Sequence, residues 1–183
     1  PLPAGGYVLV VDQTRGDASV LASQGCDTLF SEMLYYAQEN HPGQRIVIKT
    51  HPETTAGRRQ GYFGHEHVTR SNISLYSGAA SIWDLLENAI AVYTVSSTVG
   101  FEAIMAGHKP HVFGQPFYAG WGLSHDAFPV SRRQRKLTKA QLVAAALIKY
   151  PIWYDPFRDQ LCDVETVLDI QHARQSAYIG DQR

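Results

Sequence analysis

The stretch from residue 92 to residue 103 constrains the fold more than any other part of the chain. It begins with apolar, β-branched residues, which are typical of a parallel strand covered on both faces. Three hydroxyl residues follow, and apolar residues then recur at helical spacing from Phe101 to Met105 until Gly107. This order predicts a buried strand, a tight turn and a helix that Gly107 ends.

The turn gathers the hydroxyls of Ser96, Ser97 and Thr98 at the start of a helix, beside free backbone N–H groups. Such groups bind phosphate. Glu102 falls one turn further along, where a carboxylate can accept hydrogen bonds from ribose hydroxyls. The alternative is an ordinary helix cap with a solvent-facing Glu, and the motif by itself favours neither interpretation.

Two carboxylates and an amide follow the first expected strand, in Asp12, Gln13 and Asp17. Gly16 permits a positive φ there and would aim Asp17 into a cleft. The alternative is a turn in which Asp12 and Asp17 only cap backbone groups. For this loop taken alone, the alternative is favoured.

The second expected strand ends in Lys49, Thr50, His51 and Pro52. Pro52 restricts His51 to extended geometry and lacks an N–H that would compete for an anion. Imidazole and ammonium groups at the end of a strand favour a phosphate site over the alternative, in which His51 is only exposed in a loop. Because parallel strands end at one edge of a sheet, the polar residues after the three strands are expected to share a crevice.

Apolar runs alternate with helical patterns along the chain, which predicts an α/β fold with a doubly wound, Rossmann-like parallel sheet. One such lobe is expected to span residues 1–183. Strands are expected at residues 7–11, 45–50, 72–76, 89–95 and 109–114, and helices at 27–40, 81–88, 101–105, 138–150 and 163–177.

Composition excludes several classes of protein. The formal net charge is −1, which argues against nucleic acid as a partner. The densest basic stretch, residues 132–136, is read as a solvated loop slightly ahead of an anion contact. Cys26 and Cys162 have no metal-binding spacing, and His65 and His67 lack a third ligand, so no metal is predicted. No apolar run is long enough to span a membrane.

An aromatic, glycine-rich loop without periodicity covers residues 115–123. Such a loop either plugs the rim of the sheet or forms a platform for a sugar or base. Composition leaves these two readings even.

Four motifs together resemble the capsular polysaccharide β-Kdo transferases of the KpsC or LipB type. They are VDQTRGDAS at residues 11–19, KTHPE at 49–53, VSSTVGFEA at 95–103 and GQPFYAGWGL at 114–123. The resemblance runs over nearly the whole chain and includes residues 137–156. Residues 124–126 depart from it, because a more acidic stretch is expected there, and they are left out of the catalytic set.

The resemblance implies a retaining glycosyltransferase of GT-B-like architecture that uses CMP-β-Kdo, with no metal cofactor. It would extend a poly-Kdo linker on a lyso-phosphatidylglycerol acceptor in capsule biosynthesis and polysaccharide transport. It would work as a cytoplasmic protein peripheral to a Gram-negative inner membrane, with other capsule assembly proteins. Members have two transferase modules of two lobes each. This chain corresponds to one donor-binding lobe, inactive alone, whose helix at residues 163–177 is expected to pack toward the acceptor lobe.

The resemblance also suggests residue roles. His51 and the hydroxyls of residues 96–98 would bind the CMP phosphate beside Lys49 and Pro52, and Glu102 would bind the ribose. Asp17 is the first candidate for the nucleophile or acid at the anomeric carbon and Asp12 the second, while Gln13 could bind the Kdo carboxylate.

Two other functions share these features. A nucleotide-sugar 2-epimerase of GT-B-like fold has a similar Ser/Gly turn and a following Glu, and it would release nucleotide without glycosyl transfer. A non-catalytic component of capsule export would bind nucleotide or act as a scaffold. Asp17 would be dispensable in that second case.

Overall fold

The computed structural model describes residues 2–180. The chain forms two compact units, residues 1–137 and residues 138–183. The whole parallel sheet lies in the first unit. Among the described residues, the strands of the second unit pair only with each other. That one Rossmann-like lobe spans residues 1–183 stays a prediction.

Six parallel strands form the sheet, in the spatial order β3-β2-β1-β4-β5-β6. Leu9 in β1 pairs with Val47 in β2 on one side and with Val92 in β4 on the other. The direction of winding reverses between β1 and β4, and this is the place where open α/β sheets form a ligand crevice. The strands are β1 (Tyr7–Val11), β2 (Arg45–Lys49), β3 (Ile73–Tyr76), β4 (Ala89–Thr94), β5 (His111–Val112) and β6 (His125–Asp126).

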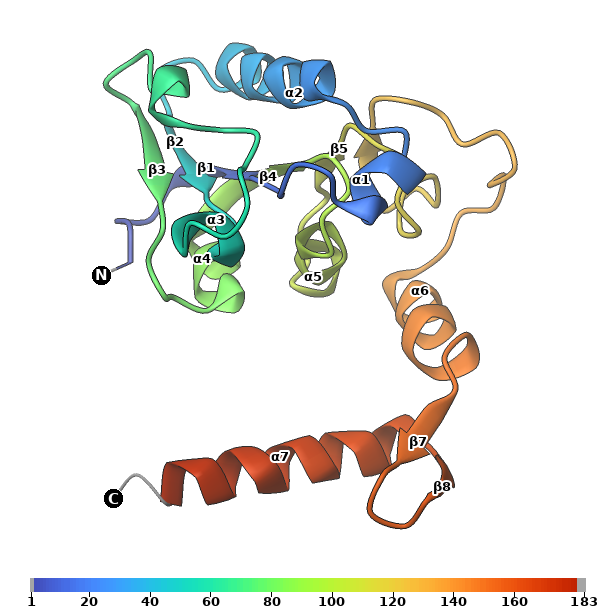
Figure 1. Cartoon of the computed structure of the whole chain (residues 1–183). Helices are drawn as coiled ribbons and strands as arrows, with labels where there is room; N and C mark the ends of the chain where they lie inside the picture. The colour runs from blue at the N-terminus through green and yellow to red at the C-terminus, as the bar shows by residue number, and fades with distance from the viewer. Residues whose placement is uncertain (1, 181–183) are drawn as a thin grey trace. The chain divides into compact units, whose positions relative to one another are not determined.

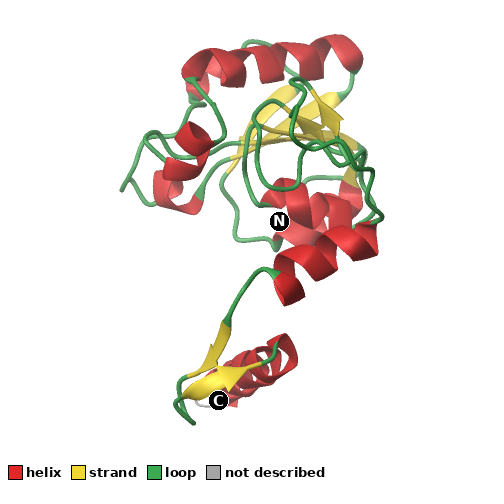
Figure 2. Cartoon of the chain, turned by 90° about the vertical axis from the view of Figure 1, so that its right-hand side faces the viewer, coloured by secondary structure: helices red, strands yellow, loops and turns green. Residues whose placement is uncertain are grey.

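Helices cover both faces of this sheet. α2 lies on one face, and α4 and α5 lie on the other (Figure 1). Figure 2 shows the strands as a layer between helices. The helices of the first unit are α1 (Ala18–Ala22), α2 (Asp27–Asn40), α3 (Pro52–Thr55), the short 3₁₀ helix η1 (His65–His67), α4 (Ile82–Asn88) and α5 (Val99–Met105).

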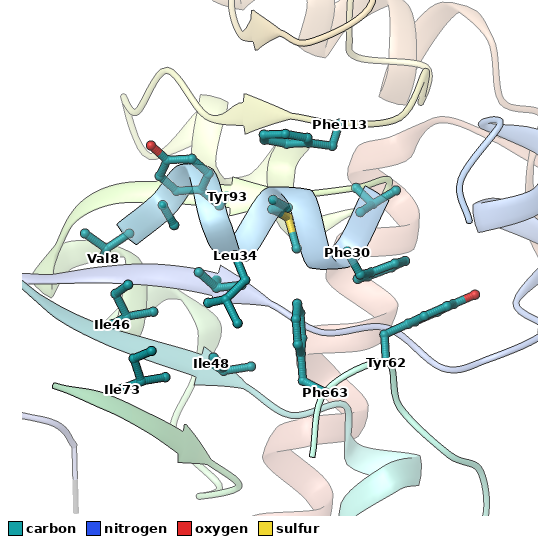
Figure 3. Packing of buried hydrophobic residues seen from close by; sticks show 14 of the residues in the cluster. Val8, Phe30, Leu34, Ile46, Ile48, Tyr62, Phe63, Ile73, Tyr93 and Phe113 are labelled. Carbon is teal, nitrogen blue, oxygen red and sulfur yellow. The ribbon is translucent and has the colours of Figure 1, made fainter. Parts of the chain in front are cut away.

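The larger core cluster packs beneath α2 (Figure 3). This helix buries Phe30, Met33, Leu34 and Ala37, whose spacing places them on one face. Phe30 stacks on Tyr62 with ring centroids 3.7 Å apart, so the loop after α3 is part of the core. The cluster on the opposite face of the sheet joins Leu85 and Leu86 of α4 and Ala103 of α5 to alternate residues of β1.

The second unit begins with α6 (Lys139–Ala144), which Thr138 and Gln141 cap reciprocally. A π-helical segment, η2 (Ala145–Lys149), follows it. Strands β7 (Trp153–Asp155) and β8 (Gln160–Cys162) form an antiparallel hairpin, and α7 (Val164–Gly180) comes last. No helix among residues 2–180 is long and apolar enough to cross a membrane.

The predicted α/β fold class is confirmed. Each predicted strand of the sheet is present, and the predicted helix at residues 27–40 has those bounds. β6, β7 and β8 were not predicted as strands, because strands of two and three residues carry too short a pattern to be recognised. The helix predicted at residues 138–150 changes to a π-helical segment at Ala145.

Candidate functional site

A cavity of about 660 Å³ opens at the carboxyl ends of β1, β2, β3 and β4. It lies at the switch point of the sheet, and its walls contain six of the ten predicted site residues. The other four, Gln13, Asp17, Ser96 and Glu102, do not line it. The six that do are Asp12, Lys49, His51, Pro52, Ser97 and Thr98.

Gln13 and Ser96 join the ends of β1 and β4. The Ser96 amide donates to Gln13 Oε1 at 2.9 Å, and Gln13 Nε2 donates to Ser96 Oγ at 3.1 Å. Both residues are buried. Because these bonds engage both ends of the Gln13 amide, the side chain acts here as a clasp between the two loops. Contact with a sugar carboxylate would require it to release that clasp.

Asp12 is 2 % exposed. Its Oδ1 accepts hydrogen bonds from the amides of Gln13 and Tyr62, each at 2.9 Å. Its Oδ2 is buried without a hydrogen-bond partner among the described residues. Burial raises the pKa of Asp12 to about 6. A carboxyl group with a free oxygen and such a pKa can exchange a proton near neutral pH.

Gly61 lies against Asp12, and a Cβ at that position would come within 2.2 Å of Asp12 Oδ2. Gly61 also forms an antiparallel β-bridge with Thr14. Next to it, the Arg15 amide donates to Gln60 O at 2.8 Å. The loop after α3 thus fixes the loop after β1. The sequence analysis assigned this loop no such role, because its closely spaced glycines were the only local sign of a close backbone approach.

Asp17 is half-buried and caps α1, where its Oδ1 accepts from the Ser19 amide at 2.8 Å. Gly16 has the positive φ that was predicted, at +73°. The turn therefore forms as expected, and the Asp17 carboxylate serves as a helix cap in this structure. Its place beside the crevice, on the loop that follows β1, keeps its catalytic role a prediction.

His51 begins α3, and its Nδ1 accepts from the Glu53 amide at 3.2 Å. This bond places the proton of a neutral imidazole on Nε2, which leaves an N–H to donate to a ligand. Pro52 occupies the first turn of the helix, where its missing N–H costs nothing. Lys49 Nζ donates to the Thr50 carbonyl at 3.0 Å, and burial lowers the pKa of Lys49.

The turn after β4 presents Ser97 and Thr98 to the same cavity. The Ser97 amide donates to Thr94 Oγ1 and the Ser97 hydroxyl accepts from the Val99 amide, both at 3.2 Å. The exposed Thr98 makes no side-chain cap bond in α5. Its hydroxyl is therefore available to a ligand. Glu102 lies in α5 outside the lining, and burial raises its pKa.

The loop at residues 115–123 plugs the rim. Tyr118 is fully buried, and its hydroxyl donates to the Ser97 carbonyl at 2.5 Å. A Cβ at Gly100 would lie 2.3 Å from that hydroxyl, so the glycine makes room for the ring. Phe117 stays 48 % exposed beside Phe101. The loop thus supports the turn after β4 through Tyr118, a role that composition left open.

No group of His, Cys, Asp and Glu side chains within residues 2–180 has the arrangement of a metal site. Within that same range, the cavity offers donors from His51, Lys49 and Thr98 and one carboxyl acceptor, from Asp12. This combination can hold an anion and place a titratable carboxyl group beside it.

Comparisons with known proteins identify a family and several relatives of this chain. Residues 4–153 match the model of the family described as "Capsule polysaccharide biosynthesis protein". The capsule polysaccharide modification protein LipA of Neisseria meningitidis serogroup B is 35% identical over 165 residues, which are 89% of this chain and 23% of LipA. The lipopolysaccharide-processing protein LpsZ of Rhizobium meliloti is 37% identical over 79% of this chain and 32% of its own length.

Two solved structures share the fold. The β-Kdo 2,4 transferase of Thermosulfurimonas dismutans KpsC is 36% identical, with a TM-score of 0.83 over 92% of this chain and 52% of that one. The β-Kdo 2,7 transferase of the same KpsC is 29% identical, with a TM-score of 0.72 over 91% of this chain and 53% of that one. The chain thus spans about a quarter of LipA and about half of each KpsC structure.

Proposed function

Because this chain belongs to the family of capsule polysaccharide biosynthesis proteins, we propose that it is the donor-binding lobe of a glycosyltransferase that uses CMP-Kdo. The protein transfers β-Kdo to a growing poly-Kdo linker on a lyso-phosphatidylglycerol acceptor. The likeness to the KpsC β-Kdo transferases, at 36% identity and a TM-score of 0.83, supports the reaction class. A second lobe supplies the acceptor side, and this chain alone is inactive.

The observation that carries the proposal is the convergence of donors at the switch point of the sheet. His51, Lys49 and Thr98, each of which has a side-chain donor, line one cavity. A single phosphate diester, such as that of a CMP-sugar, needs about this many hydrogen-bond donors and no metal for charge neutralisation. Glu102, on the helix that follows the turn, would accept from the ribose hydroxyls.

The reaction proposed is a double displacement that retains configuration. The Asp17 carboxylate leaves its cap on α1 and attacks the anomeric carbon of Kdo, while the bond from that carbon to the phosphate oxygen breaks and CMP leaves with the electron pair. An acceptor hydroxyl then attacks the same carbon, gives its proton to a base and restores the carboxylate. Asp12, whose pKa burial raises to about 6, suits the proton transfer.

The test is Kdo transfer from CMP-Kdo to a synthetic acceptor by the complete protein that contains this chain. We expect Asp17→Ala to lower the transfer rate by about a thousandfold or more and to leave CMP binding intact, because the carboxylate reacts and does not hold the nucleotide. Glu165→Ala, an exposed change in α7, is the matched control. Unchanged transfer in the Asp17 variant would remove Asp17 from the role. CMP release without transfer by the unaltered protein would favour an epimerase-like reaction.

The proposed place of action is the cytoplasmic face of a Gram-negative inner membrane, with the protein peripheral to the bilayer and beside other capsule assembly proteins. A CMP-activated sugar is made where CTP is available, which favours the cytoplasm. The acceptor is a glycolipid, which favours the membrane surface.

A further inference from the structure

Residues 120–136 form a second cavity, of about 400 Å³, that shares no lining residue with the crevice. Its walls come from the end of the aromatic loop and from the basic stretch that sequence analysis left open. Three of its residues carry a positive charge and one a negative charge. They are Arg133, Arg135, Lys136 and Asp126.

The positive charges of this basic cavity form no close ion pair among the described residues, although Asp126 lies near enough to Arg133 to raise its pKa against the effect of burial. None of the ion pairs within the described part of the chain involves Arg133, Arg135 or Lys136. The Asp126 oxygens are engaged by the Gly120 amide at 2.9 Å and by the Ser124 hydroxyl at 2.6 Å. The cavity is therefore net cationic, and the exposed side chains of Arg135 and Lys136 can reach an anion.

Arg133 is held in place by the aromatic loop. Its Nη1 donates to the carbonyls of Pro116 and Ala119, at 2.5 and 2.7 Å, and its guanidinium lies 5.5 Å from the centre of the Trp121 ring. A cation fixed by two carbonyls and an aromatic ring loses little freedom when it meets a ligand. Arg135 and Lys136 are exposed beside it.

Two glycines let the aromatic loop approach the basic stretch closely. Gly120 and Gly122 both have φ of +81°, and a Cβ at Gly120 would lie 3.2 Å from Val130 Cβ. The Leu137 amide donates to the Trp121 carbonyl at 3.0 Å and closes the far end. Side chains at these glycines would strain the backbone, so the hollow is a built feature of this loop.

We propose that the basic cavity binds the carboxylates of an acidic oligosaccharide, the acceptor or product chain of the transferase; this rests on the proposed function. A chain of acidic sugars carries one carboxylate on each sugar. Several neighbouring cations suit such a row of carboxylates better than they suit a single phosphate. Guanidinium groups suit planar carboxylates, because their parallel N–H groups can donate to both oxygens. Through Tyr118, the same loop contacts the carbonyl of Ser97 in the crevice.

The test is a calorimetric titration of this chain with a short Kdo oligosaccharide. The control ligand is the same oligosaccharide with its carboxyl groups reduced to alcohols. We expect the acidic form to bind and the reduced form to bind at least about tenfold more weakly, with affinity for the acidic form falling as salt rises. Equal binding of the two forms, or no binding of either, would overturn the proposal.

Single charge changes locate the site. Arg135→Gln and Lys136→Gln should each weaken binding by about threefold to tenfold. Arg132→Gln is the matched control, because Arg132 is exposed in the same stretch but does not line the cavity, and it should change affinity less than twofold. Equal losses in all three variants would mean unspecific attraction and would contradict the proposal.

Two further arms separate the possible causes of failure. The first uses vesicles of phosphatidylglycerol. If the chain binds these vesicles more tightly than the oligosaccharide, and the same variants weaken that binding, the cavity binds a membrane surface and the oligosaccharide proposal is overturned. CMP titration of each variant should be unchanged. If the variants bind CMP normally but no longer bind the oligosaccharide, the proposed function stands. If the unaltered chain does not bind CMP, that result counts against the proposed function itself.

Discussion

The two sides of the crevice use their polar groups in opposite ways. On the side of β1 and β4, Gln13 and Ser96 bond to each other and Asp12 Oδ1 accepts from two amides. On the side of β2, His51 Nε2 makes no hydrogen bond to the described residues, and Lys49 Nζ donates to the Thr50 carbonyl beside the Tyr76 ring. One side holds the loops in position and the other presents donors to a ligand.

This difference separates positioning from binding. Loss of a hydrogen-bond partner destabilises the fold far more when the remaining polar group is buried than when it is exposed. Substitutions on the side of β1 and β4, the closed side, should therefore act first on stability. Substitutions of donors on the side of β2, the open side, should act first on the affinity for CMP. The predictions below break or sharpen that division, and the largest expected effect comes first.

Removal of the clasp should have the largest effect. Gln13→Ala would leave the Ser96 amide and hydroxyl buried without their partner and lower the free energy of unfolding by about 2–4 kcal/mol. CMP affinity should fall as well, because the turn at Ser97 loses its anchor. Urea denaturation measures the first effect, with the exposed Gln134→Ala as control. A loss below about 0.5 kcal/mol would show that the clasp does not hold the loops together.

Asp12 should make stability depend on pH. Its pKa, which burial raises to about 6 in the folded protein, exceeds its value in the unfolded chain, so the folded state binds the proton more tightly. The free energy of unfolding should therefore fall as pH rises from about 4 to about 6, by up to about 3 kcal/mol. Asp12→Asn should remove this slope. Parallel pH profiles of both proteins would contradict the assignment to Asp12.

The open side is tested by a substitution of His51 that keeps the helix-capping bond of Nδ1 and removes the donor Nε2. His51→Asn keeps a side chain that can cap α3 through the Glu53 amide but lacks Nε2. We expect CMP affinity to fall about tenfold with stability nearly unchanged, whereas His51→Ala should lower both. Titration and thermal unfolding of the two variants make the comparison. Full CMP affinity in the Asn variant would exclude Nε2 as the phosphate donor.

The smallest effect is expected at the exposed ion pair beside the closed side. Arg15 and Asp27 form a salt bridge whose side chains are 43% and 67% exposed. Asp27→Asn should change the free energy of unfolding by less than about 1 kcal/mol, because exposed pairs contribute little. A larger loss, seen in the same denaturation experiment, would mean that this pair also fixes the loop after β1.

The strands and the edge where they end could be predicted from sequence, because apolar runs and their polar ends are local patterns. The sequence also predicted ten site residues at or after three strand ends, and six of them line one cavity. It could not predict which would bond to each other. The clasp joins residues 83 positions apart, and the Tyr62 amide reaches Asp12 across 50 positions. Such pairings depend on how loops fold back on the sheet, which no local pattern encodes.

The aromatic loop gives a second example. Composition left it even between a plug and a platform, and Tyr118 decided the matter by its burial and its bond to the Ser97 carbonyl. The only local signs were Gly100, Gly120 and Gly122. Their positive φ or close contacts become visible only with the neighbours in place.

The central claim is that the open side of the crevice and the turn after β4 bind CMP. The most direct measurement is calorimetric titration of this chain with CMP, UMP and UDP, with His51→Ala and Ser97→Ala as variants. The account predicts that CMP binds more tightly than UMP or UDP and that both variants lose this binding. CMP affinity that stays the same in both variants would contradict it.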